Sequence, residues 1–100
     1  MRYLTLAADY TGAALRDDFP DVKDPEPFEL PPELWAALKD WNRRYGPIIF
    51  LDPLERAEPT NADLIRHLDA EGKDLAGTVV RELGNVKVRY YSEGLLRYVD

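Results

Sequence analysis

The sequence has 100 residues, with 13 Lys and Arg against 19 Asp and Glu, and it contains no cysteine. Its length fits a single domain over residues 1–100, and its apolar content of 45% excludes a disordered chain. The lack of cysteine excludes disulfides, thiolate metal sites and a cysteine nucleophile. The apolar runs are too short for a membrane span or a secretory signal, so we expect a soluble, cytoplasmic protein.

Acidic residues are concentrated in the first third of the chain. The segment 17–33 holds seven acidic residues, one Lys and five prolines. Because proline fixes φ and removes a backbone donor, this segment is predicted to be an extended loop, either a solvated connector or a binding surface. The net charge of −6 argues against nucleic acid and anionic membrane as partners, and it permits a basic protein.

The chain begins with an alternating pattern over residues 2–10, which predicts a strand with Leu4, Leu6, Ala8 and Tyr10 on one face. A turn at Thr11-Gly12 should follow. Residues 13–16 are compatible with either a second short strand or a turn of helix.

Two helices are predicted in the middle of the chain. The first spans 32–45, with an apolar stripe of Leu34, Leu38, Trp41 and Tyr45, and Gly46-Pro47 is a stop signal. Residues 47–51 form an apolar run, expected to be a buried short strand or connector, and Asp52-Pro53 should open a short helical turn.

The second helix is predicted over 61–83, capped by Thr60 or Asn61. Its expected stripe is Leu64, Leu68, Leu75, Val79 and Leu83, widened by Ile65, Ala76 and Val80. Gly72 falls on this stripe, where glycine costs about 1 kcal/mol relative to alanine, so we expect a close approach of the first helix there, or a break.

The C-terminal residues 86–99 predict a hairpin that turns at Ser92-Glu93-Gly94. The order of elements indicates a two-layer α/β (α+β) domain. We expect a three- to four-stranded, mainly antiparallel sheet packed on two antiparallel helices.

Catalytic signals are weak in this sequence. His67 is the single imidazole and lies among carboxylates on a helix, and Ser92 lacks the G-x-S-x-G context of a nucleophile elbow. We therefore assign no catalytic residue, no metal site and no cofactor, and expect a role in binding rather than catalysis.

Three segments carry a resemblance to known sequences: Trp41 to Ile49, Leu68 to Ala76, and Lys87 to Leu96, which includes KVRYYSEGLL. Together they resemble a group of short, uncharacterised bacterial proteins. The resemblance covers most of the chain and implies one self-contained unit, and it brings no activity or site.

The first functional hypothesis is a small acidic protein-binding module. Its size, acidity and missing catalytic groups match the profile of immunity or antitoxin proteins that cover a basic partner. The expected contacts are acids of the loop with aromatic anchors: Asp17, Asp18, Asp21, Asp24, Glu26, Glu29, Trp35, Tyr90 and Tyr91.

The second hypothesis is a small-molecule-binding or catalytic α/β protein with a site at the strand ends. Its pocket would be lined by Asp9, Thr11, Arg89, Tyr91 and Arg97. The third hypothesis is a homo-oligomeric protein, such as a homodimer, that associates through Trp35 and the edge of the hairpin. The tyrosine and arginine cluster near Tyr90 fits either an interface or cross-strand pairing within the hairpin.

Overall fold

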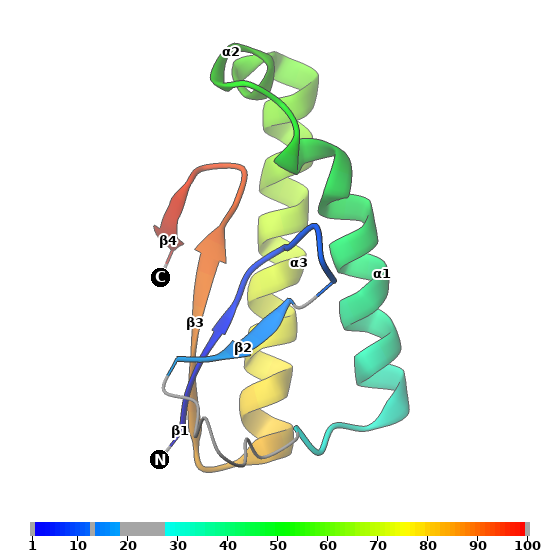
Figure 1. The fold of residues 1–100 in the computed structure, drawn as a ribbon, viewed down its shortest axis with the longest axis vertical. Helices are drawn as coiled ribbons and strands as arrows, with labels where there is room; N and C mark the ends of the chain where they lie inside the picture. The colour runs from blue at the N-terminus through cyan, green and yellow to red at the C-terminus, as the bar shows by residue number, and fades with distance from the viewer. Residues whose placement is uncertain (1, 13, 19–27, 100) are drawn as a thin grey trace.

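The computed structural model describes residues 2–12, 14–18 and 28–99. Four strands and three helices follow one another as β1 (Arg2–Leu6), β2 (Leu15–Asp17), α1 (Pro32–Ile49), α2 (Pro53–Ala57), α3 (Pro59–Leu83), β3 (Val86–Ser92) and β4 (Arg97–Val99). The sheet order is β2-β1-β3-β4 (Figure 1). The fold class predicted from the sequence is confirmed.

The sheet combines two antiparallel pairs with one parallel pair. β1 pairs antiparallel with β2, and β3 with β4, whereas β1 and β3 run parallel with Leu4 opposite Val88. The parallel pair requires a crossover, which the three helices provide. Of the segment 13–16, which fitted strand or helix, Leu15 and Arg16 belong to the edge strand β2, and residue 13 lies outside the described residues.

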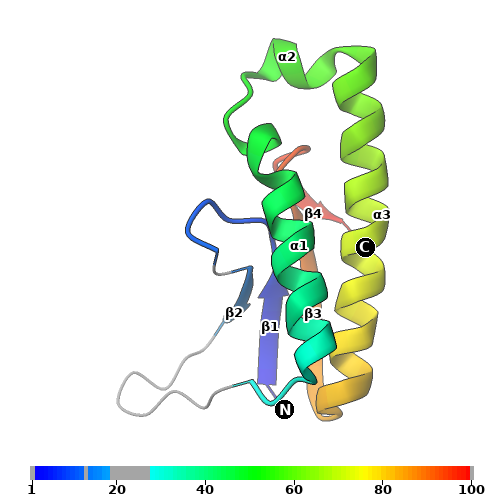
Figure 2. The ribbon, with the colours of Figure 1, turned by 90° about the vertical axis from the view of Figure 1, so that its right-hand side faces the viewer.

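The two long helices cover one face of the sheet and run antiparallel to each other (Figure 2). The predicted stripe of α1 is buried and forms the centre of the core, and Ile48 continues it. None of the helices in the described residues covers the other face of the sheet, and α2 lies at one end of the molecule, beyond the turn of the β3–β4 hairpin (Figure 1).

Helix α1 does not stop at Gly46-Pro47 but ends at Ile49, with Pro47 inside it. Burial of Ile48 on the apolar stripe outweighs the local stop signal. The expectation of a buried run over 47–51 was therefore wrong: Ile48 is buried, but Phe50 is 78% exposed.

The buried stripe of α3 also differs from the predicted one. It comprises Ile65, Leu68, Asp69, Gly72, Ala76 and Val79, while Leu64 is exposed. The helix begins at Pro59, and neither Thr60 nor Asn61 is its N-cap, which is Glu58 without a side-chain cap. Ile65, Leu68, Gly72, Ala76 and Val79 lie on the predicted stripe, whereas Asp69 was not expected in the core, and Leu75 and Leu83 are only partly buried.

Strand β1 is shorter than the alternation suggested and ends at Leu6. Ala8 is buried, but Tyr10 is 76% exposed, so the two residues do not lie on one buried face as predicted. The carboxylate of Asp9 accepts a hydrogen bond from the Thr11 backbone at 3.1 Å, and Gly12 has a φ of 89°. These two features form the tight turn that pulls Tyr10 away from the core.

Within the described residues, no helix combines the length and the apolar character needed to cross a membrane.

Candidate partner-binding surface

A buried carboxylate organises the interface between the helices and the sheet. Asp69 on α3 is 6% exposed and accepts hydrogen bonds from Tyr45 of α1 at 2.8 Å, and from Tyr90 at 2.6 Å and Ser92 at 2.7 Å, both of β3. Three hydroxyl donors converge on one carboxylate, which satisfies it without a counter-ion. The Asp69 network (Asp69, Tyr45, Tyr90 and Ser92) thus joins α1, α3 and β3.

The network raises the pKa of both of its tyrosines. Burial is the main cause, and the neighbouring carboxylate of Asp69 adds to it by disfavouring a phenolate. Tyr45 and Tyr90 are therefore protonated donors at neutral pH, and their hydroxyls are occupied within the fold.

The same network holds the turn of the β3–β4 hairpin. We call residues 93–96 (Glu93, Gly94, Leu95 and Leu96) the hairpin tip. The backbone of Gly94 donates to the Tyr45 hydroxyl at 2.9 Å, and the backbone of Leu95 donates to Ser92 Oγ at 3.0 Å. A Cβ at Gly94 would lie 2.6 Å from the Ile65 side chain, so glycine is required for this close approach.

Arg56 of α2 fixes the hairpin tip from the other side. Its guanidinium donates to the carbonyl of Glu93 at 2.7 Å and to the carbonyls of Ile49 and Leu51 at 3.1 and 3.0 Å. The last two bonds satisfy carbonyls at the end of α1 that have no helical partner. One side chain therefore links the end of α1, α2 and the hairpin tip.

Helix α2 is itself firmly capped. The Asp52 carboxylate accepts from the Glu55 backbone at 2.8 Å, and the Glu55 carboxylate accepts from the Asp52 backbone at 3.1 Å. This capping box, with Pro53 in the first turn, matches the helical opening predicted from Asp52-Pro53.

Between α2, the start of α3 and the hairpin tip lies a groove of about 670 Å³. Leu95 and Leu96 line it and remain 47% and 56% exposed, and Leu54 on α2 is 82% exposed. Large apolar side chains left in water at one end of a small protein are typical of a binding surface.

The structure separates the predicted partner-binding acids. Asp17 pairs with Arg2 at 2.8 Å, while Asp18 accepts from Thr5 at 2.6 Å and lies 3.3 Å from Arg89. Both carboxylates thus have cationic partners within the fold. Glu29 is exposed, whereas Asp21, Asp24 and Glu26 lie outside the described residues.

The predicted aromatic anchors occupy three different environments. Tyr90 is 4% exposed within the Asp69 network, so its side chain is not available at the surface. Tyr91 packs edge-on against Tyr98 with ring centroids 5.1 Å apart, the cross-strand pairing that the sequence left open. Trp35 is half-buried against Phe28, with ring centroids 6.5 Å apart.

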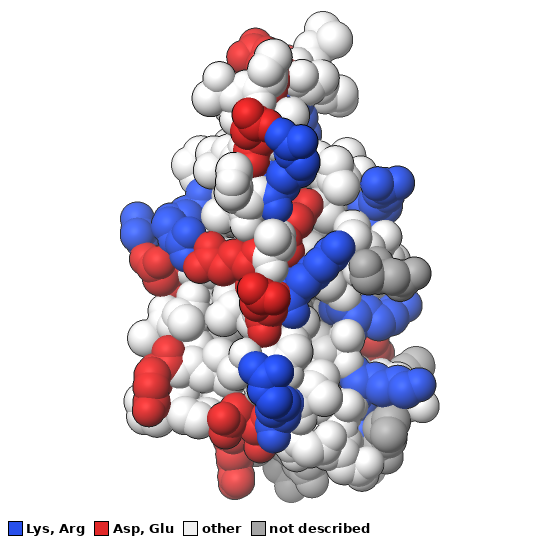
Figure 3. All heavy atoms as spheres, turned by 180° about the vertical axis from the view of Figure 1, so that it is seen from behind, with Lys and Arg blue, Asp and Glu red and all other residues white. Residues whose placement is uncertain are grey.

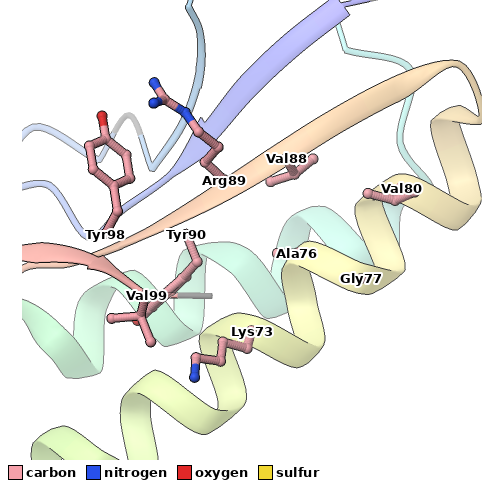
Figure 4. Close-up of a pocket in the computed structure, with 9 residues that line it drawn as sticks. All are labelled: Lys73, Ala76, Gly77, Val80, Val88, Arg89, Tyr90, Tyr98 and Val99. Atoms are coloured by element: carbon pink, nitrogen blue, oxygen red, sulfur yellow. The ribbon is translucent and has the colours of Figure 1, made fainter.

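The residues of the predicted strand-end pocket are distributed over the turn after β1 and the β3–β4 hairpin. Asp9 and Thr11 belong to the turn after β1, and Arg97 lies on the opposite face of the hairpin from Tyr91. Arg89 alone of the five lines a groove of about 330 Å³ between α3 and the β3–β4 pair. In Figure 4 its side chain points away from α3, toward the open side of the sheet with Tyr98.

The exposed side of the helices carries charges of both signs, which alternate along it (Figure 3). Several are paired: Arg44 binds Glu71 at 2.8 Å, and Arg66 pairs with Asp63. Arg43 and Arg44 hold the pKa of the Asp40 carboxyl below its usual value. Along most of this face, opposite charges therefore lie next to each other.

The weak catalytic signals are not supported by the geometry. Ser92 Oγ donates to Asp69, and the exposed His67 ring lies 2.8 Å from the carbonyl of Asp63. Among the residues described, no group of three or more His, Asp or Glu side chains is placed to hold a metal ion.

Sequence reasoning missed the Asp69 network and the Arg56 contacts, and it placed the hairpin turn at 92–94, whereas the turn occupies 93–96. Two signals were present. The first is Asp69, which follows the stripe residue Leu68. An acidic residue on an amphipathic helix is normally assigned to the surface unless its hydrogen-bond partners are known. Two consecutive leucines directly after Glu93-Gly94 are unusual in a turn, where polar residues or glycine are preferred.

No curated protein and no solved structure matches the chain. A family of known proteins does match it, over residues 2–93, which span β1 through β3 and all three helices. The resemblance to uncharacterised bacterial proteins is thereby sharpened to a named family: the chain belongs to the Serratia CdiI immunity protein-like family.

Proposed function

We propose that this chain is an immunity protein that binds a cognate CdiA toxin domain and neutralises it. The observation that carries the proposal is the family match over residues 2–93. It agrees with the profile of size and acidity that suggested an immunity protein from the sequence. The interaction is expected in the cytoplasm.

The interior of the protein supports a role in binding. All three hydroxyls of the Asp69 network donate to one carboxylate. Within the described part of the chain, no buried side-chain oxygen or nitrogen lacks a hydrogen-bond partner. The polar groups inside the fold therefore stabilise it, and neutralisation would proceed by covering the toxin's surface.

The charge of the chain favours a basic partner. At a net charge of −6, long-range attraction would raise the association rate with a basic toxin domain. Glu29 and the three loop acids outside the described residues remain proposed contributors, as do Trp35 and Tyr91. The contribution of Asp17 and Asp18 is expected to be smaller, because Arg2 and Arg89 already offset their charges.

The test is protection in living cells. Bacteria that express the cognate CdiA toxin domain are expected to stop growing, and co-expression of this chain is expected to restore growth. The two proteins should also co-purify in a fixed stoichiometry. A CdiA toxin domain with a different immunity partner is the control and should remain toxic.

Continued growth arrest, together with no complex between the toxin domain and the folded chain, would contradict the proposed function.

A further inference from the structure

The hairpin tip ends in a backbone conformation that leucine rarely adopts. Leu96 has a φ of 56°, and among the described residues no other non-glycine residue has a positive φ. This left-handed region is unfavourable for an ordinary L-residue, and glycine or asparagine adopts it far more readily. Leucine is thus an unfavourable choice for the backbone at this position.

Burial does not compensate for that cost. The Leu96 side chain is 56% exposed and faces the groove beside α2. An apolar side chain that is both strained and left in water weakens the free protein. Strain of this kind is typical of binding sites, where a partner gains from the presented side chain.

The hairpin tip is also held rigidly from three directions. Tyr45 binds the backbone of Gly94, Ser92 binds that of Leu95, and Arg56 binds the carbonyl of Glu93. A turn fixed in this way loses little conformational entropy when it binds, which increases affinity. Leu95 and Leu96 therefore have a fixed conformation before any partner binds.

The segments that form this surface carry more acidic than basic residues, while the groove itself is lined by Arg56, Arg66 and one acid, Asp63. Residues 52–66 together with Glu93 carry five carboxylates against two arginines: Asp52, Glu55, Glu58, Asp63 and Glu93, with Arg56 and Arg66. Arg56 is engaged with backbone carbonyls, and Arg66 pairs with Asp63. Acidic and uncharged atoms predominate where α2 lies at the top of Figure 3.

From these observations we propose that the hairpin tip and α2 form the docking site for the toxin domain. The complementary surface on the toxin is basic and inserts an apolar side chain into the groove beside Leu95 and Leu96. A second copy of this chain is a poorer occupant, because two acidic ends would repel each other. This inference rests on the proposed function and adds to it the surface through which the chain would bind the toxin domain.

The first test is the substitution Leu96→Asn, with binding of the cognate CdiA toxin domain measured by calorimetry or interferometry. Asparagine tolerates the left-handed backbone, so the melting temperature is expected to stay the same or rise. Affinity is expected to fall about tenfold or more. Tyr10→Ser is the control, because Tyr10 is an exposed apolar residue of the turn after β1 and belongs neither to the hairpin tip nor to α2, and it should change affinity less than twofold.

The second test addresses charge with the double variant Glu55→Gln/Glu58→Gln. Glutamine preserves the capping box, so α2 should remain folded. The association rate at low salt is expected to fall several-fold, and its dependence on salt should weaken. Glu33→Gln/Glu82→Gln removes two exposed charges of α1 and α3 outside the docking site and should have a smaller effect.

The outcomes separate the two proposals. If the wild-type chain binds the toxin domain but Leu96→Asn binds within twofold of it, the docking site is wrong while the immunity function stands. If the folded wild-type chain does not bind, both proposals fail. A concentration-dependent dimer that Leu96→Asn abolishes, and that competes with toxin binding, would assign the surface to self-association and overturn the inference.

Discussion

Asp69 connects the interior of the protein to its proposed docking site. Its carboxylate accepts from Tyr45 and Ser92, and these two residues in turn hold the backbone of the hairpin tip. A buried acid that binds three hydroxyl donors is therefore a positioning residue for Leu95 and Leu96. It acts on the partner through the turn, without contacting it.

Substitution of Asp69 by alanine is expected to destabilise the fold by about 3 kcal/mol. Hydrogen bonds to a charged group contribute about 1.5–3 kcal/mol each, and the buried donors would lose their common acceptor. Urea denaturation measures the change. Asp74→Ala, at an exposed position of the same helix, should stay within about 0.5 kcal/mol of wild type.

Equal urea midpoints for the Asp69→Ala variant and the wild-type chain would show that the network does not stabilise the fold.

The tyrosines of β3 show what a residue-level interpretation could and could not find. Adjacent residues of a strand lie on opposite faces, so Tyr90 and Tyr91 could not both serve one surface. The alternation of 86–92 contained this information. The hydroxyl partners of Tyr90 could not be predicted, because Asp69 lies 21 residues away in the sequence and reaches it only through the packing of α3 on the sheet.

At the scale of elements, the two glycines of α3 provide a matched pair. A Cβ at Gly72 would lie 2.3 Å from Tyr90 Cε1 and 2.8 Å from Trp41 Cζ2, both in rigid, buried rings. At Gly77 the nearest atom is the flexible end of Arg81 at 3.9 Å. The sequence predicted a close approach at Gly72, and the structure has one, made by Tyr90 as well as by Trp41 of the first helix.

Gly72→Ala is expected to destabilise the protein by about 1–3 kcal/mol because the core would be overpacked. Gly77→Ala should instead stabilise it by up to about 1 kcal/mol through helix propensity. Thermal or urea unfolding of the two variants measures both effects. Stabilisation by Gly72→Ala would mean that α3 and β3 are less closely packed than described.

The boundaries of the helices were harder to predict than their existence. Gly46-Pro47 is a strong local stop signal, yet α1 continues because Ile48 completes its buried face. Arg56 then supplies donors to the carbonyls of Ile49 and Leu51. Neither the burial nor the distant arginine is visible in the local sequence.

For the whole molecule, the pattern of elements was sufficient to predict a two-layer fold. The parallel pairing of β1 with β3 was not predictable, since nothing local indicates which strands meet across a crossover. The acidic loop was the most conspicuous feature of the sequence, but the structure draws attention to another acidic surface. That surface is assembled from α2, the start of α3 and the β3–β4 turn, which only the fold brings together.

The most direct measurement is hydrogen exchange of this chain with and without the cognate CdiA toxin domain. The account predicts that the toxin domain slows exchange most strongly in residues 93–97 and in α2 with its flanks, 52–60. The open face of the sheet, reported by β2 and β4 residues 98–99, should change little. Protection confined to that open face, with the hairpin tip and α2 unchanged, would contradict the proposed docking site.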